Sequence, residues 1–130
     1  MASPSTTAEL FTLESVVRGH HIYKRIWTPM LGERLQIEIE GDNRNDARAV
    51  AVQKCGMVVG HLPRETAKVV WYFLRRGGSG WCEITGRRKK GIGLEVPCVY
   101  TFSGPHKLVK KLEALLVKCH IKCADSCPSF

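Results

Sequence analysis

The sequence predicts a single domain with a mostly β, α+β fold: a small barrel of about six strands that carries two helices. Its 130 residues are enough for one hydrophobic core. Several short segments have the apolar pattern of a strand, and two segments repeat apolar residues with the period of a helix. Short strands with added helices are typical of a small barrel rather than a doubly wound sheet. We expect a flexible leader over residues 1–12, the domain over 13–118 and a cysteine-containing tail over 119–130.

Up to four strands are expected in the first half of the chain. The segment 13–27 is rich in β-branched residues and is predicted as one long or bent strand. Residues 35–40 alternate apolar and polar side chains, as a half-buried strand does. The loop GDNRND follows. Residues 48–54 and 57–60 then form a predicted hairpin around a Cys-Gly turn.

Two helices are expected in the second half. Pro63 suits the first position of a helix, and apolar residues recur at helical spacing from there until two glycines begin at Gly77. Pro105 opens a second helix, in which leucines form an apolar stripe with lysines largely off it.

Two further strands are expected between these helices, over residues 81–87 and 94–102. Pro97 lies within the second of them. Proline cannot donate a hydrogen bond to a strand ladder, so this position favours an edge strand or a bulge.

The positive charge is concentrated in the second half of the chain. Residues 1–60 contain seven Lys or Arg and seven Asp or Glu, whereas residues 61–130 contain thirteen basic and five acidic residues, which accounts for the whole net charge of +8. Such a region attracts polyanions, among which nucleic acid is the commonest, although a solvated basic face that aids solubility would have the same composition.

Composition also predicts the compartment. The longest apolar run is the six residues 69–74, far short of a membrane span, so no membrane partner is expected. The first residues lack the basic and apolar pattern of a secretory signal. We therefore expect an intracellular protein, nuclear or cytoplasmic, whose six cysteines are reduced.

Three sequence motifs occur in a recognisable order: GDNRNDARAVAV, then MVVGHLPRE before a helix, then LEVPCVYTFSG. In this order and spacing the chain resembles the HIRAN domain over residues 13–118. The resemblance implies an OB-like barrel that binds single-stranded DNA and captures a free 3′ end. In larger proteins this domain accompanies a Snf2-type helicase motor, whose phosphate-binding sequence this chain lacks.

The resemblance also implies site residues. The acidic residue of the family's loop matches Asp46, and the loop asparagine matches Asn43. The histidine of the Gly-His element matches His61, and the basic residue at the start of the next helix matches Arg64. A carboxylate is a good acceptor for a terminal sugar hydroxyl, while cations beside a helix N-terminus favour an anion.

The sequence departs from the family where bases stack. DNA-binding members have aromatic rings at the positions of Ile22 and Asn45. Tyr23 follows the first of these and would reach the same face only through a bulge. Trp27 is another possible stacking platform.

Each of these residues has a structural alternative. Asp46 fits a turn residue, and His61 fits a helix cap or a partner of a buried carbonyl. The basic run of Arg87, Arg88, Lys89 and Lys90 fits a solvated hairpin tip as well as a phosphate clamp. The aromatic residues in the middle of the first helix are expected in the core, and they are Trp71, Tyr72 and Phe73.

No metal site, cofactor or catalytic machinery is predicted. Cys119, Cys123 and Cys127 recur every four residues, a spacing that matches no common zinc site, and an intermolecular or a regulatory thiol pair fits them equally well. Neither paired acids nor an activated nucleophile can be located. The sequence therefore favours a non-enzymatic domain that binds nucleic acid, single-stranded DNA above all. The alternative is a protein-interaction module on the same barrel.

Overall fold

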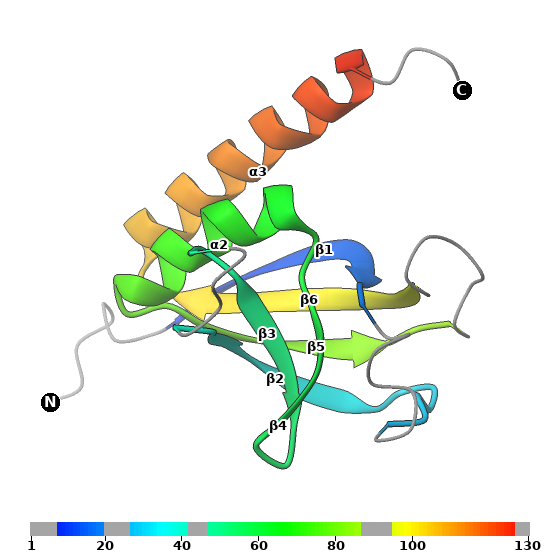
Figure 1. The fold of residues 1–130 in the computed structure, drawn as a ribbon. Coiled ribbons are helices and arrows are strands. Elements are labelled where there is room, and N and C mark those ends of the chain that lie inside the picture. Colours follow the sequence, from blue (N-terminus) through cyan, green and yellow to red (C-terminus); the bar gives the residue numbers. More distant parts are fainter. Residues whose placement is uncertain (1–7, 20–26, 42–46, 87–94, 127–130) are drawn as a thin grey trace, which may run out of the picture.

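The computed structural model describes residues 8–19, 27–41, 47–86 and 95–126, with side chains in the last segment described through Lys118 (Figure 1). The elements in chain order are β1 (Glu9–Val17), β2 (Arg34–Ile39), β3 (Val50–Lys54), β4 (Met57–His61), α2 (Arg64–Arg75), β5 (Ser79–Ile84), β6 (Val96–Gly104) and α3 (His106–Ser126). The six strands form one antiparallel sheet in the order β1-β6-β5-β2-β3-β4. The mostly β fold with one inserted and one C-terminal helix is confirmed.

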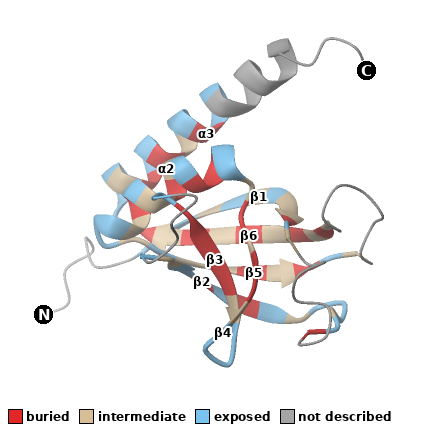
Figure 2. Ribbon diagram, viewed as in Figure 1, coloured by how far each residue is buried: buried red, intermediate tan, exposed pale blue. Residues whose placement is uncertain are grey.

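The two helices pack against each other over one end of the sheet, and α3 extends beyond it (Figure 1). Buried residues line β3 and β6 and the sides of the helices that face inward (Figure 2). The core joins Val70 and Phe73 of α2 and Leu112 of α3 to Tyr100 and Phe102 of β6. The sheet and both helices thus share one core.

The first strand differs from its prediction. Strand β1 begins at Glu9, inside the expected leader, and ends at Val17 rather than reaching Trp27. Its partner β6 offers nine residues for pairing, from Gly104 opposite Glu9 to Val96 opposite Val17, and this non-local pairing sets the strand's limits. Trp27 is buried in the core, where its Nε1 donates to Glu33 Oε1 at 3.0 Å, so it is not a stacking platform.

Pro97 lies in an interior strand, and the predicted edge position is wrong. Strand β6 is paired with β1 on one side and β5 on the other. The carbonyl of Pro97 accepts from Thr85 N at 3.0 Å, just past the last residue of β5, Ile84. A residue's nitrogen and carbonyl point to the same side of an antiparallel strand. The nitrogen of Pro97, which carries no hydrogen, therefore faces the β5 side of the strand, where β5 has already ended at Ile84.

The second helix is longer than expected. It begins at His106, directly after Pro105, and continues through Ser126, so residues 119–126 of the expected cysteine-containing tail belong to the helix. Its last fully buried side chain among those described is Leu116.

Candidate functional site

The two edges of the sheet meet where β1 and β4 end. Arg18 N donates to His61 O at 2.8 Å, and His61 N donates to Arg18 O at 2.9 Å. The close approach requires glycine at position 60, because a Cβ there would lie 2.4 Å from Val17 Cγ1 and 3.0 Å from the Arg18 carbonyl. This explains the Gly-His pair of the sequence: the glycine lets the edges meet, and the histidine is held at the meeting point.

The imidazole of His61 reaches the base of the Asn/Asp-rich loop. Its Nε2 donates to Glu40 Oε1 at 2.9 Å, with both side chains largely buried. Glu40 N in turn donates to Ala49 O at 3.0 Å, which closes the base of the loop between these two residues. The Gly-His element therefore lies beside Glu40, which with Ala49 forms the base of the loop. No side-chain cap hydrogen bond is found at Pro63, the residue that precedes α2.

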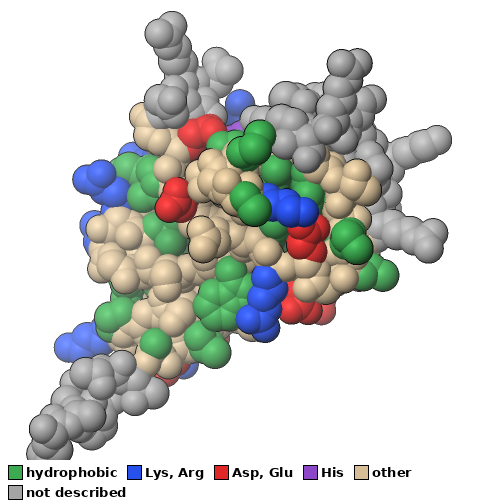
Figure 3. Space-filling model, turned by 90° about the horizontal axis from the view of Figure 1, so that it is seen from below, with side chains coloured by type: hydrophobic (Ala, Val, Ile, Leu, Met, Phe, Trp, Pro, Cys, Tyr) green, Lys and Arg blue, Asp and Glu red, His purple; other side chains and the backbone are tan. Residues whose placement is uncertain are grey.

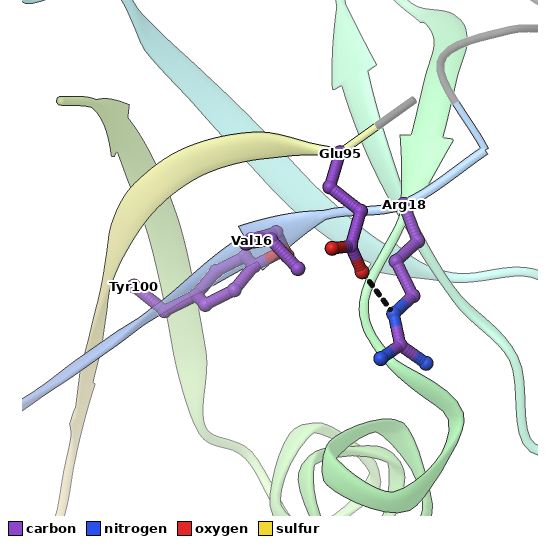
Figure 4. Close-up of polar contacts among 4 residues, drawn as sticks. All are labelled: Val16, Arg18, Glu95 and Tyr100. Carbon is purple, nitrogen blue, oxygen red and sulfur yellow. Dashed lines mark hydrogen bonds and ion pairs between the residues drawn. The ribbon is translucent and has the colours of Figure 1, made fainter. Parts of the chain in front are cut away.

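Arg18 adds a cation at this junction that sequence reasoning missed. Its Nε donates to Glu95 Oε2 at 2.9 Å, and its side chain remains 55% exposed (Figure 4). Two residues earlier, Val16 O accepts a 2.6 Å hydrogen bond from the buried Tyr100 hydroxyl, which ties β1 to β6 (Figure 4). A lone arginine at a strand end gives no sequence signal. Its position opposite His61 arises only when the sheet closes.

Arg64 lies where the sequence placed it, at the start of the first helix. It is the first residue of α2 and is exposed, three residues after His61. The positive end of the helix dipole and the guanidinium both favour an anion there, while Glu65 in the same turn works against it.

A second set of groups gathers on the outer side of α2. Of the three aromatic residues expected in the core, only Phe73 is buried, whereas Trp71 is half-buried and Tyr72 is 39% exposed. The guanidinium of Arg48 lies 6.0 Å from the centre of the Trp71 ring and 5.1 Å from that of Tyr72. The core prediction is therefore wrong for Tyr72.

The remaining predicted site residues lie outside the described part of the chain. They are Tyr23, Asn43, Asp46, Arg87, Arg88, Lys89 and Lys90, together with Ile22 and Asn45 at the family's aromatic positions. The side chains of Cys119, Cys123 and Cys127 are likewise outside it. Within the described residues, no group of three or more His, Cys, Asp or Glu side chains could hold a metal ion. No helix described is long and apolar enough to cross a membrane.

Two cysteines lie next to each other in the core and are not exposed to solvent. Cys82 of β5 and Cys98 of β6 are both buried and unbridged. The hydrogen bond with Cys98 and burial together raise the pKa of Cys82 well above its usual range, so this thiol stays protonated. A buried neutral thiol is a poor nucleophile.

Comparison with known proteins adds to this geometry. A family model described as the HIRAN domain matches residues 12–96. The crystal structure of the HIRAN domain of human HLTF is similar at 23% identity and a TM-score of 0.71, covering 87% of this chain and 93% of that one. The NMR structure of the HLTF HIRAN domain in its DNA-bound conformation has 22% identity and a TM-score of 0.65, with 90% and 95% covered.

A crystal structure of a protein from Lactobacillus plantarum is also similar, at 17% identity and a TM-score of 0.54, covering 72% of this chain and 97% of that one. At these identities the solved structures establish the fold alone. No curated protein matches the chain.

Proposed function

The chain belongs to the HIRAN domain family, and from this premise we propose that it binds nucleic acid, with single-stranded DNA as the preferred ligand and a free 3′ end as the preferred feature. A relative of the same fold, the HLTF HIRAN domain, has been solved in its DNA-bound conformation. The observation that carries the proposal is the 2.9 Å contact of His61 with Glu40, which holds the Gly-His element at the base of the loop that contains Asn43 and Asp46.

The charges around this junction suit a strand end. Arg18 and Arg64 are exposed cations on either side of His61 and would contact phosphates. The nearby carboxylate of Glu95 is paired with Arg18, which reduces its repulsion of phosphate. The carboxylate of Glu40 accepts the hydrogen bond from His61. Asp46 would accept a hydrogen bond from the terminal 3′-hydroxyl.

Further contacts in the proposal come from segments outside the described residues. The basic run from Arg87 to Lys90 would hold phosphates, and Tyr23 would stack on a base. We also propose a nuclear or cytoplasmic location, because the described cysteines Cys55, Cys82 and Cys98 are all unbridged.

The test is fluorescence-anisotropy binding of a labelled oligo-dT at several salt concentrations. We expect binding that weakens with salt, since contacts to phosphates release counterions in proportion to their number. The control is an unrelated protein of similar size and the same net charge of +8. Affinity no higher than that of the control would reject the proposal, because it would reduce the interaction to net charge alone.

One observation favours the alternative of a protein-interaction module. A groove of about 220 Å³ lies between α2 and α3, with Phe73, Leu108 and Leu112 in its lining and basic side chains at Arg76 and Lys111. An apolar groove with a basic rim would fit an acidic amphipathic segment of another protein. Binding assays with oligonucleotides separate the two functions, because only the nucleic-acid-binding function requires contacts to phosphates.

A further inference from the structure

A cluster of arginine and aromatic side chains lies on the outer side of α2 and reaches the groove between α2 and α3, whose lining includes Tyr72 and Arg76. It comprises Arg48, Trp71, Tyr72, Arg75 and Arg76, named here the Arg–aromatic cluster. The rings of Trp71 and Tyr72 meet edge to face, with centres 5.1 Å apart. The guanidinium of Arg75 lies 5.2 Å from the Trp71 ring centre, and that of Arg76 lies 5.3 Å from the Tyr72 ring centre.

The contribution of the Arg–aromatic cluster to stability does not account for its composition. An exposed contact between a cation and a ring adds little to stability, while three guanidinium groups around two rings repel one another. Among the ion pairs of the described residues, none includes Arg75 or Arg76. The cluster has an exposed ring at Tyr72 and a half-buried ring at Trp71, both beside several cations. Proteins bind single strands with such combinations, because bases stack on rings while arginines contact phosphates.

The cluster is continuous with the site proposed above. Arg48 comes two residues after Asp46 in the chain, and the segment that enters β3 runs beside α2 (Figure 1). Along α2, Arg64, Lys68, Trp71 and Arg75 follow one another at spacings of four, three and four residues, which places them on one face. This face spans about 16 Å at the rise of an α-helix.

The charge of this face contrasts with the opposite side of the molecule. Seen from below the sheet, acidic and basic side chains are interspersed among apolar ones (Figure 3). On α2 the basic residues Arg64, Lys68 and Arg75 are accompanied by one acid, Glu65, in the first turn. The outer face of α2 therefore offers an anion three cations, with Trp71 between the last two.

We infer that the outer face of α2 is a second contact surface for single-stranded nucleic acid, on which Tyr72 and Trp71 stack bases while Arg48, Arg75 and Arg76 hold phosphates. The inference rests on the proposed function and extends it: a strand whose end lies at His61 continues along α2. It also provides stacking rings in a chain that has Ile22 and Asn45 at the family's aromatic positions.

The test compares two fluorescein-labelled probes, dT4 and dT12, by anisotropy. The shorter probe occupies the end site alone, whereas the longer one also reaches α2. We expect wild-type protein to bind dT12 more tightly than dT4. Tyr72→Ala should weaken dT12 by about 5- to 100-fold, as loss of one stacked base does, and leave dT4 within about twofold. Tyr72→Phe, which keeps the ring, should retain the affinity for dT12.

Charge is tested separately from stacking. The double variant R75A/R76A should lower the slope of log affinity against log salt for dT12 by about 1.4, the value for two phosphate contacts on a single strand. The matched control is K107A/K118A, which removes two exposed cations of α3 that the inference does not use. Circular dichroism and thermal melting verify that each variant is folded.

The outcomes separate this inference from the proposed function. If wild-type protein binds neither dT4 nor dT12, both the proposed function and this inference are overturned. Tight binding of dT12 that Tyr72→Ala and R75A/R76A leave unchanged overturns the inference alone. Competition by polyglutamate as effective as that by unlabelled dT12 also overturns it, since it would assign the surface to acidic proteins.

Discussion

Arg18 and His61 exchange both of their backbone hydrogen bonds, at 2.8 and 2.9 Å, although they lie at opposite edges of the sheet in strand order. This single bridge joins β1 to β4 and draws the open sheet toward a barrel. It also fixes the backbone of His61, whose side chain reaches Glu40 at the base of the Asn/Asp-rich loop. The bridge between the two edges of the sheet thus also positions the histidine of the candidate site.

Gly60→Ala should destabilise the protein by about 1 to 3 kcal/mol, the usual cost of forcing an extra methyl into a packed site. The new methyl would lie 2.4 Å from the side chain of the fully buried Val17. This cost exceeds the gain of about 0.4 to 1 kcal/mol that glycine replacement brings through the unfolded chain. Urea unfolding measures the change. Gly41→Ala, where no neighbour lies within 4 Å, is the control and should stay close to wild type.

Tyr100→Phe should lower the free energy of unfolding by about 1 to 2 kcal/mol, because it removes the 2.6 Å hydrogen bond to Val16 O within the core. The ring itself remains, with its stacked contact to Phe102 at 6.2 Å between centres. Tyr72→Phe removes a hydroxyl from a partly exposed ring and serves as the control. Equal melting of Tyr100→Phe and wild type would show that the hydroxyl contributes nothing to holding β1.

Glu33→Gln should cost about 1 kcal/mol of stability near pH 7 and progressively less in acid. Burial works to raise the pKa of Glu33, but hydrogen bonds from Lys54, Trp27 and Met30 together with the Lys54 charge outweigh it, so its pKa is lowered. A lowered folded-state pKa stabilises the fold above the unfolded value of about 4.3 and loses that contribution as the pH falls through the folded value.

Urea unfolding of both proteins between pH 3 and pH 7 checks the prediction for Glu33. The difference in stability should be full above about pH 5 and shrink below about pH 4. A difference that stays constant down to pH 3 would assign the effect to packing rather than to the carboxylate charge.

Local signals were enough to predict most elements of the fold. Pro63 and the apolar spacing after it predicted α2, and the Cys-Gly turn of the β3–β4 hairpin has positive φ at both Cys55 and Gly56. The limits of β1 were missed because they depend on pairing with β6, some eighty residues away. Pro97 was assigned to an edge because the sequence does not reveal where the neighbouring strand stops.

The candidate site was predictable only as separate motifs. The Gly-His pair drew attention to His61, but its partners Arg18 and Glu40 directly follow two other strands, β1 and β2, and lie beside it only in the folded sheet. The exposed position of Tyr72 was missed for a different reason. Six apolar residues in a row, 69–74, cover every side of a helix, so their pattern cannot indicate which side faces the core.

Capture of a strand end by Asp46 predicts a preference for the less negatively charged of two ligands, which is the opposite of what net charge alone predicts. If Asp46 accepts a hydrogen bond from a terminal 3′-hydroxyl, an oligonucleotide with a free 3′-hydroxyl should bind more tightly than the same strand with a 3′-phosphate. A charge-assisted bond of about 1.5 to 3 kcal/mol corresponds to about tenfold or more in affinity. Simple attraction by a protein of net charge +8 favours the phosphorylated strand instead. Anisotropy titrations with the two oligonucleotides distinguish these orders.

Variants assign the preference to a residue. Asp46→Ala should lose the discrimination and, having one carboxylate fewer, bind the phosphorylated strand slightly better than wild type does. Arg64→Ala should weaken both oligonucleotides alike, because contacts to phosphates position a strand without distinguishing a hydroxyl from its ester. His61→Ala removes the contact with Glu40 at the base of the loop, so it should weaken binding and also reduce the discrimination. Equal affinity of wild-type protein for both strands would remove Asp46 from the site. Binding would then depend on the cations around His61 and α2, which recognise a strand but not its end.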